Sequence, residues 1–249
     1  VGGGGGGSGG VGEEELGREV VGGLDREHVG RLVGKVRWPT GTVQVELREG
    51  IPTYTIHERV AWDHISPTSD AIDLAEKADA ICFGTLAQRS RQSRETIQAI
   101  SSFAPKDAYR LLDINLRQRY YDKELIEESL YLANVLKVND EEFNVLRDLF
   151  GLNGTEREVA LWFIEKYGLR MFVLTAGSSH STIYTREEIS TLPTPEVTVA
   201  DTVGAGDAFS GALIISLLKG KSLSEAHHFA VKTAAFVCTK EGAWPVYEE

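Results

Sequence analysis

The chain has few cysteines, fewer basic than acidic residues, and no long apolar run. Two cysteines among 249 residues exclude a disulfide framework, and we expect Cys82 and Cys238 to be buried free thiols in a reducing compartment. Because 26 Lys and Arg stand against 37 Asp and Glu, the net charge is −11, which excludes broad binding to a nucleic-acid backbone. The apolar run at 212–218 contains a serine and is far too short to cross a bilayer.

The motifs of several common protein classes are also missing. The one Gly-Lys-Ser, at 220–222, has Ile215 where a P-loop kinase has its first glycine. A nicotinamide-dependent dehydrogenase needs its glycine turn after the first strand, whereas the glycine turn of this chain comes late and ends on Asp207. The six histidines show no zinc-ligand spacing, and no signal-peptide pattern opens the chain. We therefore expect a cytoplasmic protein with no nucleic-acid or membrane partner.

The overall composition is typical of a globular protein. Charged residues make up 25% of the chain and hydrophobic residues 42%, which is too apolar for a disordered protein. The length allows one large α/β domain or two small ones. Residues 1–10 stand apart, because eight of them are glycine and offer no side chains for packing. We expect a linker or another segment of doubtful identity there, since a phosphate-binding loop needs spaced glycines before a helix.

Hydrophobic periodicity divides the rest of the chain into two patterns. Residues 42–47 and 53–57 alternate between apolar and polar around a turn, which predicts a β-hairpin that serves as a small lid or an edge extension. From residue 70 onward, short apolar runs alternate with helical stretches, which predicts a parallel sheet with helices on both faces. The expected strands are 80–83, 109–114, 135–138, 171–175 and 181–184, and the expected helices are 13–22, 91–103, 122–133, 140–150, 155–167, 205–219 and 222–238.

The strongest chemical signal is the segment 201–207, Asp-Thr-Val-Gly-Ala-Gly-Asp, at the start of a long apolar helix. Free amides and the helix dipole at such a start suit an anion, and Gly204 and Gly206 let the backbone approach a phosphate closely. Asp207 would repel that phosphate unless it accepts a proton from an attacking alcohol. The segment therefore predicts phosphoryl transfer to an alcohol, with the structural alternative of an N-capped helix after two turn glycines.

Residues 201–209 resemble the C-terminal signature of the ribokinase-like (PfkB) carbohydrate kinases. Four further segments are similar to elements of that family, so the resemblance covers nearly the whole chain: 11–17, 139–142, 175–177 and 242–243. It implies a ribokinase-like α/β fold, with a mostly parallel central sheet, helices on both faces and a small β lid. It also implies one kinase domain over 11–249, with the lid inserted at about 38–60 and residues 1–10 outside it.

The resemblance also assigns catalytic and nucleotide-binding roles. Asp207 is the expected base, and the expected anion hole consists of the backbone amides of Gly204, Ala205, Gly206 and Asp207. The residues expected to bind ATP are Thr175, Gly177, Gly242 and Ala243. Many family members continue the turn at 175–177 to a further glycine, where this chain has His180.

Two cation sites are implied in the same way. Asn139 and Glu142 are expected to position Mg²⁺ through its waters, because phosphoryl transfer generally needs a cation that bridges phosphate oxygens. From the residues alone, 139–142 is equally a helix N-terminus with an acidic first turn. Asp201 and Val203 match positions that offer oxygens to K⁺ in some relatives.

The acceptor sugar is expected where parallel strands end. Residues 83–87 and 113–117 are similar to strand ends of fructokinases and, less closely, of 2-keto-3-deoxygluconate kinases. We therefore expect Gly84, Asn115 and Arg117 to bind the sugar, with the amide and the guanidinium fork contacting its oxygens. The lid would exclude water and would pair with the lid of a second subunit, which predicts a homodimer.

One part of the family pattern is not legible. Members begin with a strand that carries an early sugar-binding Asp and with a Gly-Gly-x-x-x-Asn motif, so we expect truncated or misread sequence at this end of the chain. The resemblance implies an ATP-dependent sugar kinase, with fructose as the expected substrate. Two alternatives stay open: another PfkB-type kinase, of 2-keto-3-deoxygluconate, a different sugar or a nucleoside, and a catalytically inactive nucleotide-binding regulator on the same fold.

Overall fold

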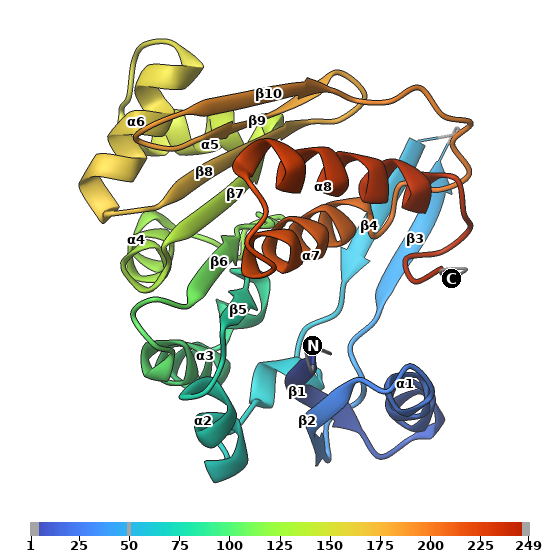
Figure 1. The fold of residues 1–249 in the computed structure, drawn as a ribbon. Helices are drawn as coiled ribbons and strands as arrows, with labels where there is room; N and C mark the ends of the chain where they lie inside the picture. The colour runs from blue at the N-terminus through green and yellow to red at the C-terminus, as the bar shows by residue number, and fades with distance from the viewer. Residues whose placement is uncertain (1–4, 49–50, 246–249) are drawn as a thin grey trace. The chain divides into compact units, whose positions relative to one another are not determined.

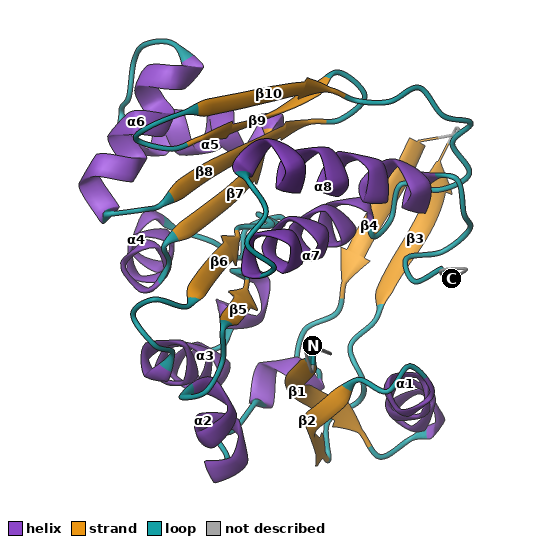
Figure 2. Ribbon diagram, in the orientation of Figure 1, coloured by secondary structure: helices purple, strands orange, loops and turns teal. Residues whose placement is uncertain are grey.

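A computed structural model describes residues 5–48 and 51–245. The chain divides into two compact units. Unit 1 comprises residues 1–78 and 85–105, and unit 2 comprises residues 79–84 and 106–249. Among the described residues, unit 1 contains two two-stranded sheets and unit 2 contains one six-stranded sheet (Figures 1 and 2).

The sheet of unit 2 is mostly parallel, as the sequence predicts. Its strand order is β10-β9-β8-β7-β6-β5, in which β5 to β8 are parallel and β9 and β10 are antiparallel additions at one edge. The four parallel strands therefore end along the same border of the sheet, its carboxyl edge, where ligands bind in open α/β folds. The strands are β5 Ala80–Phe83, β6 Tyr109–Asp113, β7 Val135–Asn139, β8 Met171–Ala176, β9 His180–Tyr184 and β10 Ile189–Pro193.

Helices cover both faces of this sheet (Figure 1). Leu111 and Val135 belong to a buried cluster with residues of α7 and α8. On the opposite face, the ring of Phe172 contacts Phe143 of α5 and Phe163 of α6, with centroids 6.2 and 5.8 Å apart. Successive strand residues point to opposite faces, so apolar residues in sequence build two cores. The helices are α4 Lys123–Leu132, α5 Asp140–Phe150, α6 Glu156–Tyr167, α7 Ala205–Leu218 and α8 Leu223–Cys238.

The ends of these helices follow local sequence signals. α5 and α6 end at Gly151 and Gly168, whose φ angles of 65° and 66° favour glycine. α7 differs at its start, because Gly204 precedes it with φ 85° and no side chain caps it. Three helices instead begin with reciprocal capping boxes, formed by Asn139 and Glu142, by Thr155 and Glu158, and by Ser222 and Glu225.

A glycine-rich strand opens unit 1. β1 (Gly6–Gly12) pairs in parallel with β2 (Gly30–Val36), and α1 (Glu15–Arg26) connects the two strands. A Cβ at Gly10 would lie 2.7 Å from the carbonyl oxygen of Ala61, so a glycine permits this close approach. The glycine-rich composition predicts a linker or a segment of doubtful identity at residues 1–10, whereas residues 6–10 lie in β1. Backbone pairing needs no side-chain pattern, which is why periodicity gives no signal for this strand.

The predicted hairpin is present in unit 1 as β3 (Val43–Arg48) and β4 (Ile51–Ile56), which pair antiparallel. Its role as a lid stays a prediction, and residues 49–50 of its turn lie outside the described residues.

Elsewhere in unit 1, Arg89 Nε and Asp63 Oδ1 form a buried ion pair at 2.7 Å. The remaining elements are the 3₁₀ turns Ala61–His64 and Leu86–Arg89, α2 (Ser69–Ala75) and α3 (Arg91–Phe103).

Some local expectations were wrong or incomplete. Cys82 is exposed and Cys238 is half-buried, although both are free thiols as expected. The sequence did not predict β2, β10 or α2. β10 alternates exposed and half-buried residues and ends at Pro193, as an edge strand can, so its hydrophobic signal is weak.

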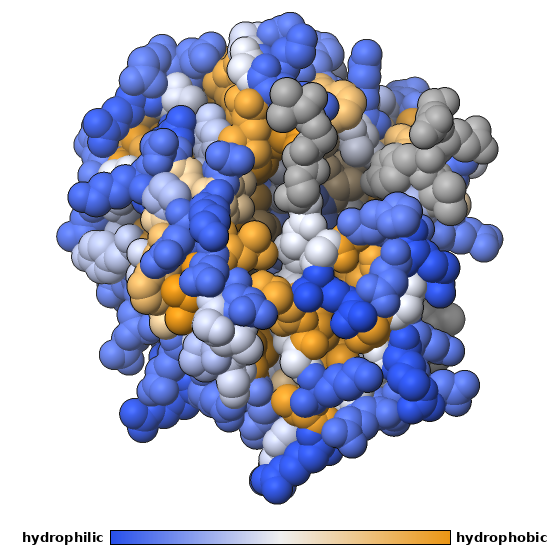
Figure 3. Space-filling view, turned by 60° about the horizontal axis from the view of Figure 1, so that its bottom comes forward, coloured by the Kyte–Doolittle hydropathy of each residue, from blue (hydrophilic) through white to orange (hydrophobic). Residues whose placement is uncertain are grey.

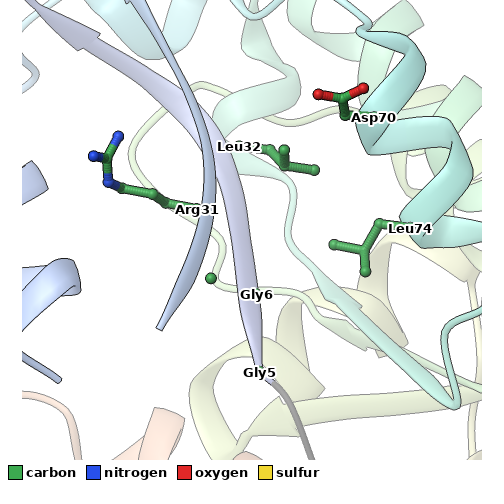
Figure 4. Close-up of a pocket in the computed structure, with 7 residues that line it drawn as sticks. Gly5, Gly6, Arg31, Leu32, Asp70 and Leu74 are labelled. Atoms are coloured by element: carbon green, nitrogen blue, oxygen red, sulfur yellow. The ribbon is translucent and has the colours of Figure 1, made fainter. Parts of the chain in front are cut away.

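The surface of the molecule is mixed. Figure 3 shows apolar patches among charged side chains on one face. Within unit 1, a cavity of about 330 Å³ lies between the β1–β2 pair and α2 (Figure 4). Leu32 and Leu74 line it, while the side chain of Arg31 extends from the other side of its strand. No helix in the described ranges is long and apolar enough to cross a membrane.

Candidate active site

The carboxyl ends of the parallel strands carry five of the residues predicted from the sequence. Gly84 follows β5, and Asn115 and Arg117 follow β6. Asn139 ends β7 and pairs in register with Thr175 near the end of β8. All of these positions belong to unit 2, so a single sheet edge brings them together.

The N-terminus of α7 lies at the same edge. Ser210 Oγ is 3.0 Å from Oδ2 of Asp113, the last residue of β6. A Cβ built on Gly206 would lie 3.3 Å from Nζ of Lys137 in β7. These two contacts place the glycine turn beside the strand ends, as the predicted phosphoryl-transfer site requires.

The first turn of α7 leaves backbone amides open. In the described part of the chain, the amides of Gly204, Gly206 and Asp207 have no acceptor, whereas the Ala205 amide donates to the Thr202 carbonyl at 3.3 Å. A Cβ on Gly204 would collide with the carbonyl oxygen of Ala243, so both the φ angle and the space demand glycine. Open amides at a helix N-terminus carry partial positive charge and form an anion site.

Asp207 projects from this first turn as an exposed residue. Across the described residues, its carboxylate makes no hydrogen bond or ion pair. Partial removal from solvent is the main reason that the pKa of Asp207 is raised. The charge of Asp113 raises this pKa further, whereas Lys137 and Arg117 lower it. A carboxylate with a raised pKa and no fixed partner suits proton transfer.

The sequence reasoning missed an ion pair beneath this turn. Lys137 Nζ donates to Asp113 Oδ2 at 2.7 Å, and both side chains are more than nine-tenths buried. A signal exists in the sequence, because Lys137 interrupts the apolar run of a predicted buried strand. Its partner stands 24 residues away on another strand, and spacing alone does not reveal such a pair.

Glu142 connects two parts of the site. Its Oε2 accepts from the Asn139 amide at 2.9 Å, and Asn139 Oδ1 accepts in return from the Glu142 amide at 2.8 Å. Its Oε1 accepts from the Leu116 amide at 2.9 Å and lies 3.6 Å from Nη1 of Arg117. Burial raises the pKa of Glu142, and these two amides and Arg117 oppose that effect. The carboxylate thus joins the start of α5 to the loop after β6.

These bonds bear on the predicted magnesium site. In the ranges that the structure covers, no group of three or more His, Cys, Asp or Glu side chains could hold a metal ion directly. Glu142 uses one lone pair on each oxygen for an amide, which leaves other lone pairs that can accept water. These oxygens fit an ion held through its waters better than one held directly, and the magnesium role of Asn139 and Glu142 stays a prediction.

The predicted sugar-binding residues contact one another. Arg117 Nη2 donates to Asn115 Oδ1 at 2.9 Å, and Arg117 Nη1 donates to the Leu116 carbonyl at 3.0 Å. Asn115 has a φ angle of 44°, a left-handed conformation that asparagine tolerates better than most residues. A Cβ at Gly84 would lie 2.9 Å from the Asp113 carbonyl, so β5 and β6 meet closely there.

The remaining predicted residues lie around the glycine turn and on the hairpin of β8 and β9. Asp201 accepts from the Val203 amide at 3.0 Å and from the Gly242 amide at 3.2 Å, which lowers its pKa. The Gly242–Ala243 turn is thereby fixed against the start of α7. Gly177 turns with φ 49° after β8, and its carbonyl accepts from Thr194 Oγ1 at 2.8 Å.

An open helix end attracts an anion, and the unbonded carboxylate beside it can take up a proton. Phosphoryl transfer to an alcohol needs both functions at one place. The fold and the site therefore define a kinase that acts on an alcohol acceptor. The chain matches the model of the pfkB family carbohydrate kinases over residues 7–248, and it belongs to that family of sugar kinases.

Individual relatives agree with this assignment. An uncharacterized sugar kinase of Pyrococcus horikoshii, PH1459, is 29% identical over 244 residues, which are 94% of this chain and 74% of that protein. Its structure in complex with ATP has a TM-score of 0.78 at 26% identity and covers 95% of this chain and 78% of that one. The predicted ribokinase-like fold is thus confirmed.

Two enzymes with named substrates are also similar. A fructokinase of Rhizobium leguminosarum bv. trifolii is 29% identical over 184 residues, which are 72% of this chain and 55% of the fructokinase. An aminoimidazole riboside kinase of Salmonella typhimurium is 28% identical over 203 residues, which are 77% of this chain and 61% of that kinase. The chain therefore spans less than two thirds of the length of these two enzymes.

Proposed function

We propose that the protein transfers the γ-phosphoryl group of ATP to a hydroxyl group of fructose. The observation that carries this proposal is the exposed carboxylate of Asp207, which has no bonding partner among residues 5–48 and 51–245 and stands beside amides that lack an acceptor there. The ATP complex of the Pyrococcus relative supports ATP as donor, and the fructokinase relative supports fructose as acceptor. Use of ATP also favours a cytoplasmic location.

Asp207 serves as the general base. Its carboxylate accepts the hydroxyl proton while the sugar oxygen forms a bond to the γ-phosphorus. The bond between that phosphorus and the β–γ bridging oxygen breaks, and ADP leaves with the bonding electrons. The amides of Gly204, Gly206 and Asp207 donate to the phosphoryl oxygens, where they stabilise charge without reorganising. The Ala205 amide joins them if its long bond to Thr202 is released.

Binding of the nucleotide uses the neighbouring turns. Thr175 and Gly177 at the end of β8 approach its phosphates, and Gly242 and Ala243 pack beside the start of α7. Asn139 and Glu142 would hold the waters of Mg²⁺, and Asp201 and Val203 would offer oxygens to a K⁺ ion. When bound, these cations neutralise charge on the phosphates.

The sugar is held at the loop after β6. Asn115 and Arg117 are already oriented by their mutual hydrogen bond, which lowers the entropy cost of binding. Gly84 lets the end of β5 approach the Asp113 carbonyl at the start of this loop. The role of the β3–β4 hairpin as a lid that excludes water, with an edge that pairs with a second copy of the chain, is part of this proposal.

A coupled assay for ADP tests this function. Purified protein is incubated with ATP and Mg²⁺ and with each of fructose, ribose, 2-keto-3-deoxygluconate and aminoimidazole riboside. Fructose should accelerate ADP formation most. Asp207→Asn should lower kcat by on the order of 10²- to 10⁴-fold while ATP binding persists.

Asp148→Asn is the matched control, because Asp148 is a solvent-exposed helical aspartate of the same unit, with a side chain that is 81% exposed. Its kcat should equal that of the wild type. A riboside that outperforms fructose would reassign the substrate to the class of the Salmonella relative. ATP binding without acceleration by any acceptor would favour a nucleotide-binding regulator.

A further inference from the structure

Three buried polar side chains beneath the first turn of α7 take no part in the proposed chemistry. Lys137 Nζ lies 2.7 Å from Asp113 Oδ2, and Ser210 Oγ lies 3.0 Å from the same oxygen. The side chains of Lys137 and Asp113 are 7% and 8% exposed, and Ser210 is also buried. The three residues come from β7, β6 and α7, so their contacts join two strand ends to one helix. We call them the buried trio.

Stability alone is a weak reason for such a trio. Desolvation of two charges offsets most of their attraction, and an apolar pair of similar size often supports a fold equally well. The trio does what apolar side chains cannot do, because Asp113 accepts a hydrogen bond from one residue of α7, Ser210. Ser210 Oγ is also 3.0 Å from the Gly206 carbonyl oxygen, so it stands between Asp113 and the glycine turn.

The trio also places charge beside the proposed base. Nζ of Lys137 lies 3.3 Å from the position of a Cβ on Gly206, directly beside the residue that precedes Asp207. The groups that face Asp207 are Asp113 and Arg117 on and after β6, Lys137 on β7, and the Cys82 thiol on β5. Lys137 and Arg117 favour the ionised form of Asp207, whereas Asp113 disfavours it.

We propose that Lys137 and Asp113 are positioning residues for phosphoryl transfer, which act through Ser210 to set the direction of the Asp207 carboxylate and of the amides beside it. This inference rests on the proposed role of Asp207 as the base. Small displacements at a reacting centre lower rates strongly, so the hold on the first turn of α7 matters more for kcat than for ATP binding.

The test compares Lys137→Met, Asp113→Asn and the double variant. Each single variant should lower kcat by on the order of 10- to 100-fold. The acidic limb of kcat/KM should move to higher pH in Lys137→Met and to lower pH in Asp113→Asn, because the two charges act oppositely on Asp207. In the double variant the limb should return toward its wild-type position. A purely structural role would lower kcat without moving the limb in opposite directions.

Lys221→Met is the matched control, because Lys221 forms an exposed ion pair with Glu225 in the same unit. It should change neither kcat nor the limb. If the single variants fail to fold, the inference is tested with the double variant, which carries neither charge, and with Ser210→Ala. Wild-type kcat in both would overturn the inference. Amide hydrogen exchange of residues 205–209 measures how firmly the first turn of α7 is held and does not depend on activity. The exchange should be faster in Ser210→Ala.

The two proposals fail in different ways. An active Asp207→Asn variant would refute the proposed base. An inactive Asp207→Asn variant beside a Lys137→Met variant with wild-type kcat, pH limb and hydrogen exchange would refute only the positioning role.

Discussion

Helices α5 and α7 both begin at the carboxyl edge of the same sheet, and their first turns are built differently. At α5, Asn139 and Glu142 form a capping box in which each side chain accepts from the amide of the other residue. At α7, Gly204 stands at the cap position with no side-chain acceptor. The first arrangement satisfies amides with protein atoms, and the second leaves amides open for a ligand.

For the first-turn acids, the comparison uses the exposed capping box of α6, because burial raises the pKa of Glu142 in the box of α5. Glu158, in the capping box of α6, has a pKa lowered by hydrogen bonds from Thr155. Asp207 receives no such bond, and partial burial raises its pKa. The capping box of α6 thus uses its carboxylate to accept local hydrogen bonds, whereas the first turn of α7 leaves a carboxylate that can take up a proton.

Apart from loss of the base itself, Gly204→Ala should have the largest effect on activity. The new Cβ would collide with the Ala243 carbonyl oxygen and would require a left-handed conformation at φ 85°. We expect kcat to fall on the order of 10²-fold or more, as when an oxyanion-hole donor is lost. Gly211→Ala is the control within the same helix, since no atom lies within 4 Å of its Cβ position. That variant should keep kcat and gain stability, and equal kcat losses in both would contradict the argument.

Glu142→Gln should have the next largest effect on activity, because it damages a capping box whose glutamate also holds the sugar loop. Its amide group cannot accept from both the Leu116 and Asn139 amides, so the loop after β6 loses one anchor. KM for the sugar should rise about tenfold, as expected for one hydrogen bond of this kind.

Glu158→Gln makes the same change in the exposed box of α6 and is the control. Its sugar KM should stay at the wild-type value. If Glu142→Gln instead raises only the Mg²⁺ concentration needed for half-maximal rate, the anchor interpretation is wrong and the water-mediated metal role is the main one.

How much of the fold and of the candidate site could be predicted from the sequence depends on how far apart the interacting residues are in the chain. The segment 201–207 was predictive because the turn at Gly204 and the first turn of α7 are local properties. The strand and helix alternation was predictive because apolar periodicity repeats within each element. The bond from Glu142 to the Leu116 amide spans 26 residues, and the pair of Lys137 and Asp113 spans 24 residues, so neither leaves a local pattern. β1 was missed because glycine carries no periodicity.

The pH dependence of turnover offers a smaller but more specific effect. Asp207 must be ionised to accept a proton, and its pKa lies above the usual aspartate value. The kcat/KM should therefore decline on acidification at a higher pH than an unperturbed aspartate would cause. A profile measured with fructose and saturating ATP checks this, and the decline should disappear from the residual rate of Asp207→Asn. An unchanged acidic limb in that variant would assign the limb to another group.

Ser222→Ala should have the smallest effect and should touch stability alone. Ser222 caps α8 by accepting from the Glu225 amide at 3.3 Å, and it lies in unit 2 as α7 does. Loss of such a cap costs about 1 kcal/mol, which corresponds to a fall in Tm of roughly 2–4 °C for a chain of this size. Thermal unfolding followed by circular dichroism measures the shift, and kcat should not change. A large loss of activity would show that a capped helix start also matters for turnover, and the distinction between capped and open starts would then fail.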